Sequence, residues 1–176
     1  MQSGNQSGFQ AGAQGGPTIE LELIASHARF SGSVTLGAYA RVSDLLNFHD
    51  EVLSVADGAV LTPTGERTAD AVAQLDIRLS DLTLVIDRSN YAPPPDAEQM
   101  VEKKSYRLLG VTDAYVITAT FFIYAGAEAV PYLRAAEPHW IPVTDVKVRS
   151  LLDRKVEFDA DFAVLHRKPL LATSVL

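Results

Sequence analysis

The stretch FSGSVTLGAYARVSDLLNFHDEVLSVADGAVL, residues 30–61, decides the fold because its pattern returns 88 positions later. Residues 118–149, TATFFIYAGAEAVPYLRAAEPHWIPVTDVKVR, align with it without a gap. The positions that agree are Leu45 with Leu133, Val55 with Val143, Asp57 with Asp145 and Val60 with Val148. Each copy reads as an alternating apolar strand, a short helix and a second strand, so we expect the chain to contain one structural unit twice.

The segments that flank the two copies predict further strands. Glu20 and Glu22 alternate with apolar residues within residues 18–25, as in a half-buried strand. We therefore expect a mainly β protein of the α+β type. In it a ββαββ unit is duplicated to give two antiparallel sheets, each with one short helix. The first repeat is expected at residues 18–90 and the second at residues 102–176.

Two segments are expected to lie outside the repeats. Residues 1–17 consist of four Q-x-G-x tetrapeptides after the initial methionine, and their uncharged, weakly apolar composition predicts a disordered tail. Residues 91–101 contain three successive prolines, which cannot occupy a central strand, and are expected to connect the two repeats.

The dipeptide Asp57-Gly58 between two apolar runs is typical of a hairpin turn. The second copy has Asp145-Val146 at this place, and valine is unfavourable where a turn requires a positive φ. The comparison favours one continuous or bulged strand in each copy, with the aspartate at a fixed point along it.

The composition narrows the class of protein. The chain has 176 residues, of which 47% are hydrophobic, and a net charge of −7, which argues against a general nucleic-acid binder. It contains no cysteine, no apolar run long enough to span a membrane and no signal-like start, so we expect a cytoplasmic protein.

The two copies differ most along their first aligned strand. In the ungapped alignment, polar residues expected to face solvent in the first copy align with apolar residues of the second, whose inward face, with Val116, Phe122 and Tyr124, is also largely apolar. The polar set is Arg29, Ser31, Ser33 and Thr35, and the apolar set is Ile117, Ala119, Phe121 and Ile123. This predicts a second-copy strand that is apolar on both faces and must be covered on both. The cover is either the first copy or another chain.

The second of these alternatives gives the leading functional hypothesis. We expect a non-enzymatic interaction or scaffold subunit that forms a homo-oligomer or joins a protein complex through the apolar set of the second copy. Trp140 is a further candidate for this interface, because tryptophan often anchors protein contacts, although a buried core aromatic is the simpler interpretation.

An alternative hypothesis is a small-ligand or signal-sensing module with its site either between the repeats or at a polar triplet of the first copy. Arg41, Asp44 and Asn47 form the densest polar pattern of the first copy and could bind a small anion. As structure, the same pattern is a helix cap with its charge partner. The second copy has Ala129, Tyr132 and Ala135 there, so the fold does not require the triplet.

The sequence predicts no catalytic, cofactor-binding or metal-binding residues. The four histidines, at positions 27, 49, 139 and 166, lack metal-ligand spacing. Glu157, Asp159 and Asp161 share one face of a strand and could bind a hard cation, but a solvated strand face is the favoured interpretation. No motif assembles a nucleophile, a base and an oxyanion site, so an enzyme is not expected.

Part of the first copy resembles a known family. Residues 30–61, and in them R-V-S-D-L-L-N at Arg41 to Asn47, resemble a small bacterial β-rich domain family with a strand followed by R-[VL]-S-D-x-L-N. The second copy keeps only the apolar frame and Asp145. The resemblance implies a bacterial β-rich domain, and since the family has no assigned function it implies no site residue.

Overall fold

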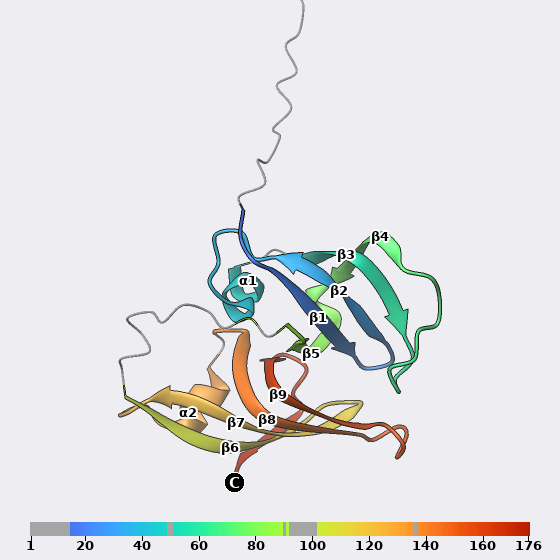
Figure 1. Cartoon of the computed structure of the whole chain (residues 1–176). Helices are drawn as coiled ribbons and strands as arrows, with labels where there is room; N and C mark the ends of the chain where they lie inside the picture. The colour runs from blue at the N-terminus through green and yellow to red at the C-terminus, as the bar shows by residue number, and fades with distance from the viewer. Residues whose placement is uncertain (1–14, 49–50, 90, 92–101, 136) are drawn as a thin grey trace, which may run out of the picture.

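The computed structural model describes residues 15–48, 51–89, 91, 102–135 and 137–176 (Figure 1). The expected tail and connector fall almost entirely outside these residues. The first half of the described chain contains β1 (Thr18–Ala25), β2 (Arg29–Thr35), α1 (Val42–Phe48), β3 (Val52–Leu61), β4 (Val72–Arg78), the 3₁₀ turn η1 (Leu79–Asp81) and β5 (Leu82–Asp87). The second half contains β6 (Lys103–Val111), β7 (Tyr115–Tyr124), α2 (Ala129–Arg134), β8 (Trp140–Ser150), β9 (Glu157–His166) and β10 (Ala172–Val175).

All ten strands belong to one sheet, in the order β10-β6-β7-β8-β9-β5-β1-β2-β3-β4. The mainly β class is confirmed, but each half has one strand more than the expected ββαββ unit. The expectation of two separate sheets is wrong. The sheets merge because β5, the last strand of the first half, pairs antiparallel with β9 of the second half. Sequence patterns within each half carry no signal for this pairing, which joins residues about eighty positions apart.

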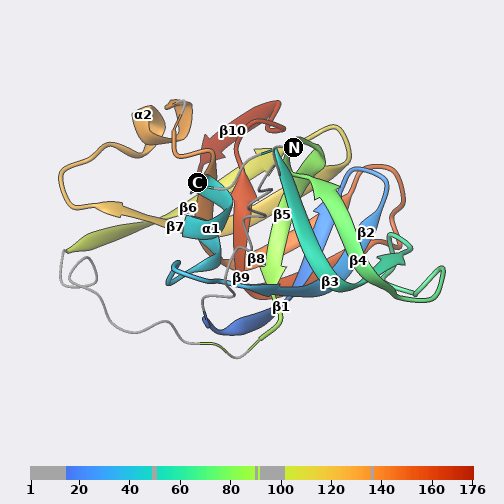
Figure 2. The same ribbon diagram turned by 90° about the horizontal axis from the view of Figure 1, so that it is seen from above.

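The strands of the two halves follow the same order. The first half reads β4-β3-β2-β1-β5 and the second reads β9-β8-β7-β6-β10, each beginning with the fourth strand of the half and ending with the fifth. Only the 3₁₀ turn Leu79–Asp81 separates β4 from β5 in sequence, yet the two strands lie at opposite edges of their half. Each half therefore curls until its two edge strands approach each other, and Figure 2 shows the two curled halves side by side.

An aspartate bulge marks both halves at the same point. Asp57 in β3 and Asp145 in β8 have φ angles of 51° and 50°, in the left-handed region that aspartate tolerates better than most residues. In both pairings the register shifts there by one residue, between Ser31 and Ser33 of β2 and at the matching point of β7. The expectation of a continuous, bulged strand with a fixed aspartate agrees with these bounds and angles.

The bulges also reveal that the ungapped alignment is one residue out of register in β2 and β7. Ser31 lies at the bulge where β7 has Thr118, an offset of 87 positions, whereas the two bulge aspartates are 88 positions apart. The second half thus has one more residue between β7 and the bulge aspartate of β8 than the first half has between β2 and the bulge aspartate of β3. Because side chains alternate along a strand, a slip of one residue exchanges the two faces.

The predicted faces of β7 are accordingly reversed. The set expected to face outward lies in the core, with relative exposures of 0% for Ile117, 0% for Ala119, 1% for Phe121 and 3% for Ile123. Phe122 and Tyr124, expected to face inward, are 45% and 48% exposed. In the corrected register Phe121 corresponds to Val34 and Ile117 to Phe30, so both halves direct an apolar face inward. The chain itself covers the apolar set.

The corrected register predicts opposite costs for two neighbouring phenylalanines. Phe121→Ala should lower the free energy of unfolding by about 3–5 kcal/mol, because it leaves a cavity in the core. Phe122→Ala should cost less than about 1 kcal/mol, because that side chain is half exposed. Urea unfolding of both variants measures the difference, and a larger loss in Phe122→Ala would show that the faces are assigned the wrong way round.

Candidate functional site between the two halves

The two halves meet along the pairing of β5 with β9. Leu84 lies opposite Leu165, Val85 opposite Val164 and Ile86 opposite Ala163, and all six are buried. The side chains of this junction enter both cores: Leu84 and Ile86 pack with the second half, and Val164 packs with the first. The halves therefore share apolar contacts as well as a backbone ladder.

Trp140, at the start of β8, is part of this junction. Its side chain is 3% exposed and packs in the apolar cluster of the first half. The indole stacks on the imidazole of His166, with 4.3 Å between ring centroids. Trp140 was predicted to anchor a contact with another protein; here it anchors a contact between the two halves of one chain.

His166 ties the end of β9 to the start of β5. Its Nδ1–H donates a hydrogen bond of 2.9 Å to the carbonyl oxygen of Leu82, which fixes the tautomer because a carbonyl only accepts. Burial lowers the pKa of His166 from 6.5, the Leu82 carbonyl opposes this, and the charges of His139 and Lys168 add to the lowering. The folded protein thus favours the neutral imidazole.

This arrangement predicts a loss of stability in mild acid. Below pH 6.5 the unfolded chain protonates His166 more readily than the folded chain, so the free energy of unfolding should fall as the pH falls from 6.5 towards the lowered pKa. The slope from this group is at most about 1.4 kcal/mol per pH unit. Urea unfolding between pH 7.5 and 5.5 measures it.

His166→Gln should remove this part of the pH dependence, since glutamine does not titrate and can still donate to Leu82. His27→Gln is the matched control, because it makes the same substitution at an exposed histidine. Equal slopes in the wild type and His166→Gln would contradict the assignment.

Asn47 of α1 holds the other side of Trp140. Its Oδ1 accepts from the backbone N–H of Trp140 at 3.0 Å, and its Nδ2 donates to the Trp140 carbonyl at 2.9 Å. A third bond joins Nδ2 to the carbonyl of Ser43, one turn earlier in the helix. Asn47, predicted as a ligand contact, is thus used to dock α1 on β8. Its partner in the predicted triplet, Asp44, is half-buried on the same helix.

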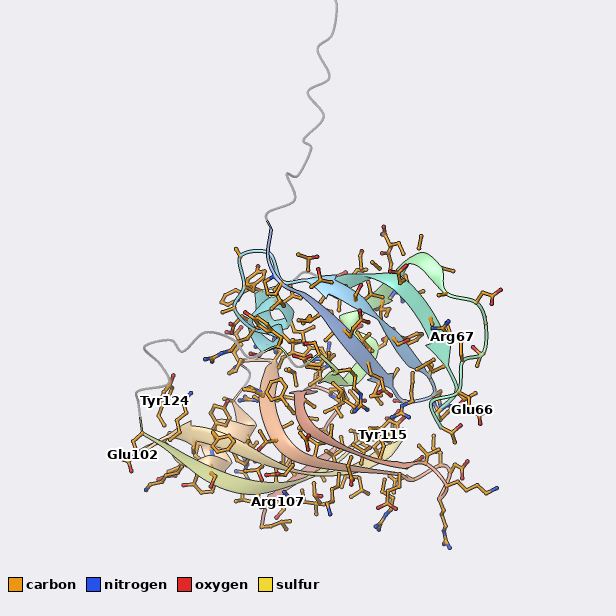
Figure 3. All side chains as sticks on the ribbon, viewed as in Figure 1. Glu66, Arg67, Glu102, Arg107, Tyr115 and Tyr124 are labelled. Atoms are coloured by element: carbon orange, nitrogen blue, oxygen red, sulfur yellow. The ribbon has the colours of Figure 1, made fainter. Side chains whose placement is uncertain are left out.

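Polar contacts also join the two halves beside the start of β5, where Ala25 pairs with Leu82. The Tyr115 hydroxyl donates to the carbonyl of Ala25 at 2.9 Å, and Ser26 donates to the carboxylate of Asp113 at 2.8 Å. Figure 3 shows Tyr115 lying between the two halves. Burial raises the pKa of Tyr115, although the charge of Arg29 opposes this, so the hydroxyl stays protonated and keeps its donor.

Arg29 was expected to face solvent but is only 5% exposed. Its guanidinium lies 3.9 Å from the ring centroid of Phe158 in the second half and pairs with Glu22 at 3.0 Å. Glu22 also binds Arg88 at 2.7 Å. Burial lowers the pKa of Arg29, and the charge of Glu22 opposes this shift. The ion pair lies within the first half, whereas the contact of Arg29 with Phe158 joins the two halves.

A cavity of about 440 Å³ lies between the halves on the side of α1. Its lining comes from segments far apart in the sequence: the start of α1, the end of β5 and the residues after it, and the strands β8 and β9 of the second half. The lining residues are Ala40, Arg41, Val42, Ser43, Asp87, Ser89, Tyr91, Pro142 and Phe162. The cavity is within the range of roughly 300–1,000 Å³ that small-molecule sites occupy.

The lining combines apolar walls with a few polar groups. Tyr91, Pro142 and Phe162 supply ring surfaces, and Arg41 supplies a cation. The carboxylate of Asp87 accepts from the Ser89 backbone N–H at 2.8 Å and from its hydroxyl at 2.6 Å, which fixes both side chains at the wall. Such a lining suits a small molecule with an apolar body and a charged or hydrogen-bonding group.

The sequence analysis predicted a ligand site either between the repeats or at Arg41, Asp44 and Asn47, and this stays a prediction. Of the three residues, Arg41 lines the cavity, whereas Asp44 and Asn47 do not. Asp87, Ser89 and Phe162 were missed, because nothing in the sequence indicates that the end of β5 lies beside β8 and β9.

Metal-binding geometry is missing from the described residues, which contain no group of three or more His, Asp or Glu side chains placed to hold an ion. Glu157, Asp159 and Asp161 are exposed on β9, and Glu157 contacts Arg149 at 3.5 Å. Among the helices of the described chain, none has the length and apolar character needed to cross a membrane.

Comparisons with known proteins give no relative: no family model, no curated protein and no solved structure matches the chain.

Proposed function

We propose that the chain is a non-enzymatic binding module that takes up a small ligand in the cavity between its halves. The observation that carries this proposal is the composition of the cavity wall. Arg41 and Asp87 place opposite charges among the rings of Tyr91, Phe162 and Pro142, and both halves contribute. Sites of this kind favour domain boundaries, where two surfaces enclose a volume that neither encloses alone.

The chemistry of the wall indicates the class of ligand. Arg41 favours a carboxylate or phosphate on the ligand, and the Asp87 carboxylate favours a donor such as an amine or hydroxyl. The apolar walls favour a planar or aliphatic body between these groups. The ligand expected is therefore a small amphipathic metabolite with an acidic group, of a size that fits about 440 Å³.

The hypothesis of a scaffold that assembles through the apolar face of β7 has lost its main support. Ile117, Ala119, Phe121 and Ile123 are buried in the chain itself, so binding a partner through them would require the second half to open. A ligand site between the halves requires no such opening and agrees with the predicted role of Arg41.

A thermal-shift screen of small carboxylates and phosphates tests the proposal. A compound that binds the folded chain should raise the melting temperature in proportion to the logarithm of its concentration. Arg41→Met keeps much of the side-chain bulk but removes the charge, and should weaken binding of the same compound by at least about tenfold, as expected for the loss of a charge-assisted hydrogen bond.

Arg67→Met serves as the matched control. Arg67 is exposed on the loop before β4, across the first half from α1 (Figures 1 and 3), and its replacement should leave the shift unchanged. A shift that survives Arg41→Met in full would place the ligand elsewhere. A screen in which no acidic compound moves the melting temperature would count against the proposed site.

A further inference from the structure

The sheet ends in two open edges, one in each half. Among the described residues, β4 pairs only with β3, and β10 pairs only with β6. The side chains of Val72, Gln74 and Asp76 on β4 are exposed, as are those of Ala172 to Ser174 on β10. Figure 1 shows β4 at the top of the first half and the C-terminus, which follows β10, at the bottom of the second.

The two edge strands occupy the same positions in their halves as the two strands that pair at the internal junction. β4 and β9 are the fourth strands of their halves, and β5 and β10 are the fifth. The internal junction therefore joins the fifth strand of one half to the fourth strand of the next. β10 is a fifth strand without such a partner, and β4 is a fourth strand without one.

The strand registers define how a second junction would pair. The pairing of β3 with β4 matches that of β8 with β9 at an offset of 88 positions in each strand, so Asp76 corresponds to Val164. By the same comparison with β1 and β6, Thr173 of β10 corresponds to Val85 of β5. Since Val85 lies opposite Val164, Thr173 would lie opposite Asp76 of another chain.

The backbone groups at both edges point the right way for this register. The N–H of Leu79 donates to Glu51 beside β3, so alternation directs Ile77 and Leu75 to β3 and leaves the backbone of Asp76 facing outward. The N–H of Leu176 donates to Arg107 beside β6, which likewise leaves Thr173 facing outward. The two residues that should pair thus both present free backbone faces.

Neither edge contains the lysine, proline or bulge that often prevents edge pairing, although β4 carries Asp76 and Arg78, and β10 has only four residues and lies beside α2. Open strands are commonly protected by lysine, proline or a bulge. β4 and β10 contain no lysine and no proline, and the register of both pairings is regular. Exposed apolar residues flank them instead: Val72 opens β4 and is 48% exposed, while Leu171 and Leu176 bracket β10 at 74% and 68%.

We propose that the chain assembles with further copies of itself head to tail, with β10 of one copy pairing antiparallel with β4 of the next in the register of the internal junction. The occupant of each edge is thus a second copy of this chain. Because the two surfaces of such an interface differ, the assembly either closes into a ring or extends as a filament.

The side chains of the outer junction indicate that it is weaker than the inner one. Leu84, Val85 and Ile86 of the inner junction are buried and apolar, whereas their counterparts Ala172, Thr173 and Ser174 are small or polar. The outer junction would keep the backbone ladder but bury less apolar surface. Assembly should therefore depend on protein concentration, with single chains at low concentration.

Light scattering and sedimentation over a wide concentration range test the proposal. The wild-type mass should rise well above that of a single chain, 19.0 kDa, as concentration increases. Thr173→Pro and Asp76→Pro each remove one outward N–H, so each alone should remain a single chain. Thr173→Ala and Asp76→Ala change the same side chains, keep the N–H and should still assemble. A cooperative thermal transition near the wild-type melting temperature would show that each variant is folded.

A mixture of the two proline variants distinguishes head-to-tail pairing from other arrangements. Thr173→Pro keeps an intact β4 edge and Asp76→Pro an intact β10 edge, so an equimolar mixture should form dimers and nothing larger. Self-association of either variant alone, or a wild type that stays a single chain at every concentration, would overturn the proposal.

A covalent test covers the case in which a proline variant does not fold. The chain has no cysteine, so Thr173→Cys and Asp76→Cys each introduce one thiol. Residues directly opposite on antiparallel strands lie about 5.5 Å or less apart at Cα, within reach of a disulfide. Under mild oxidation the mixed variants should give a disulfide dimer that contains one chain of each. Equal amounts of mixed and like-with-like dimers would contradict the register.

Discussion

The antiparallel pairing of β5 with β9 is the constraint on which the rest of the structure depends. It turns two curled five-strand units into one sheet, places Leu84 and Ile86 in the second core, and brings Val164 into the first. The cavity beside Arg41 exists because this pairing sets α1 against β8 and β9. In the part of the chain that the structure describes, β4 and β10 are the outer strands of the resulting sheet.

Local patterns were sufficient to predict the short helices, the fixed aspartate and four strands of each half, but the expected ββαββ unit omits the fifth strand that each half contains. Alternation of apolar residues depends only on neighbours along the chain, and the aspartates tolerate the positive φ that their bulges require. The assignment of faces failed for an equally local reason. One extra residue in the second half shifts β7 against β2, and alternation converts that single shift into a complete exchange of buried and exposed positions.

The site was less accessible to prediction than the fold. Arg41, which lines the cavity, was selected because its helix carries a dense polar pattern that the second copy lacks. Asp87, Ser89 and Phe162 were missed because their approach to Arg41 depends on a pairing between distant strands. Trp140 and Asn47 were selected for contacts with a partner or ligand, and both contact another half of the same chain. Residues that join repeats and residues that bind other molecules share the same chemistry, so composition alone does not separate them.

Hydrogen exchange measured at several protein concentrations tests most directly whether separate copies of the chain pair with each other in the same way as β5 pairs with β9. The amides of β5 and β9 should be protected at every concentration, because their pairing lies within the chain. The outward amides of Asp76 and Thr173 should exchange rapidly in dilute protein and become protected together as concentration rises. Rapid exchange of both amides at concentrations where the protein is assembled would show that the copies meet elsewhere, and would contradict the account.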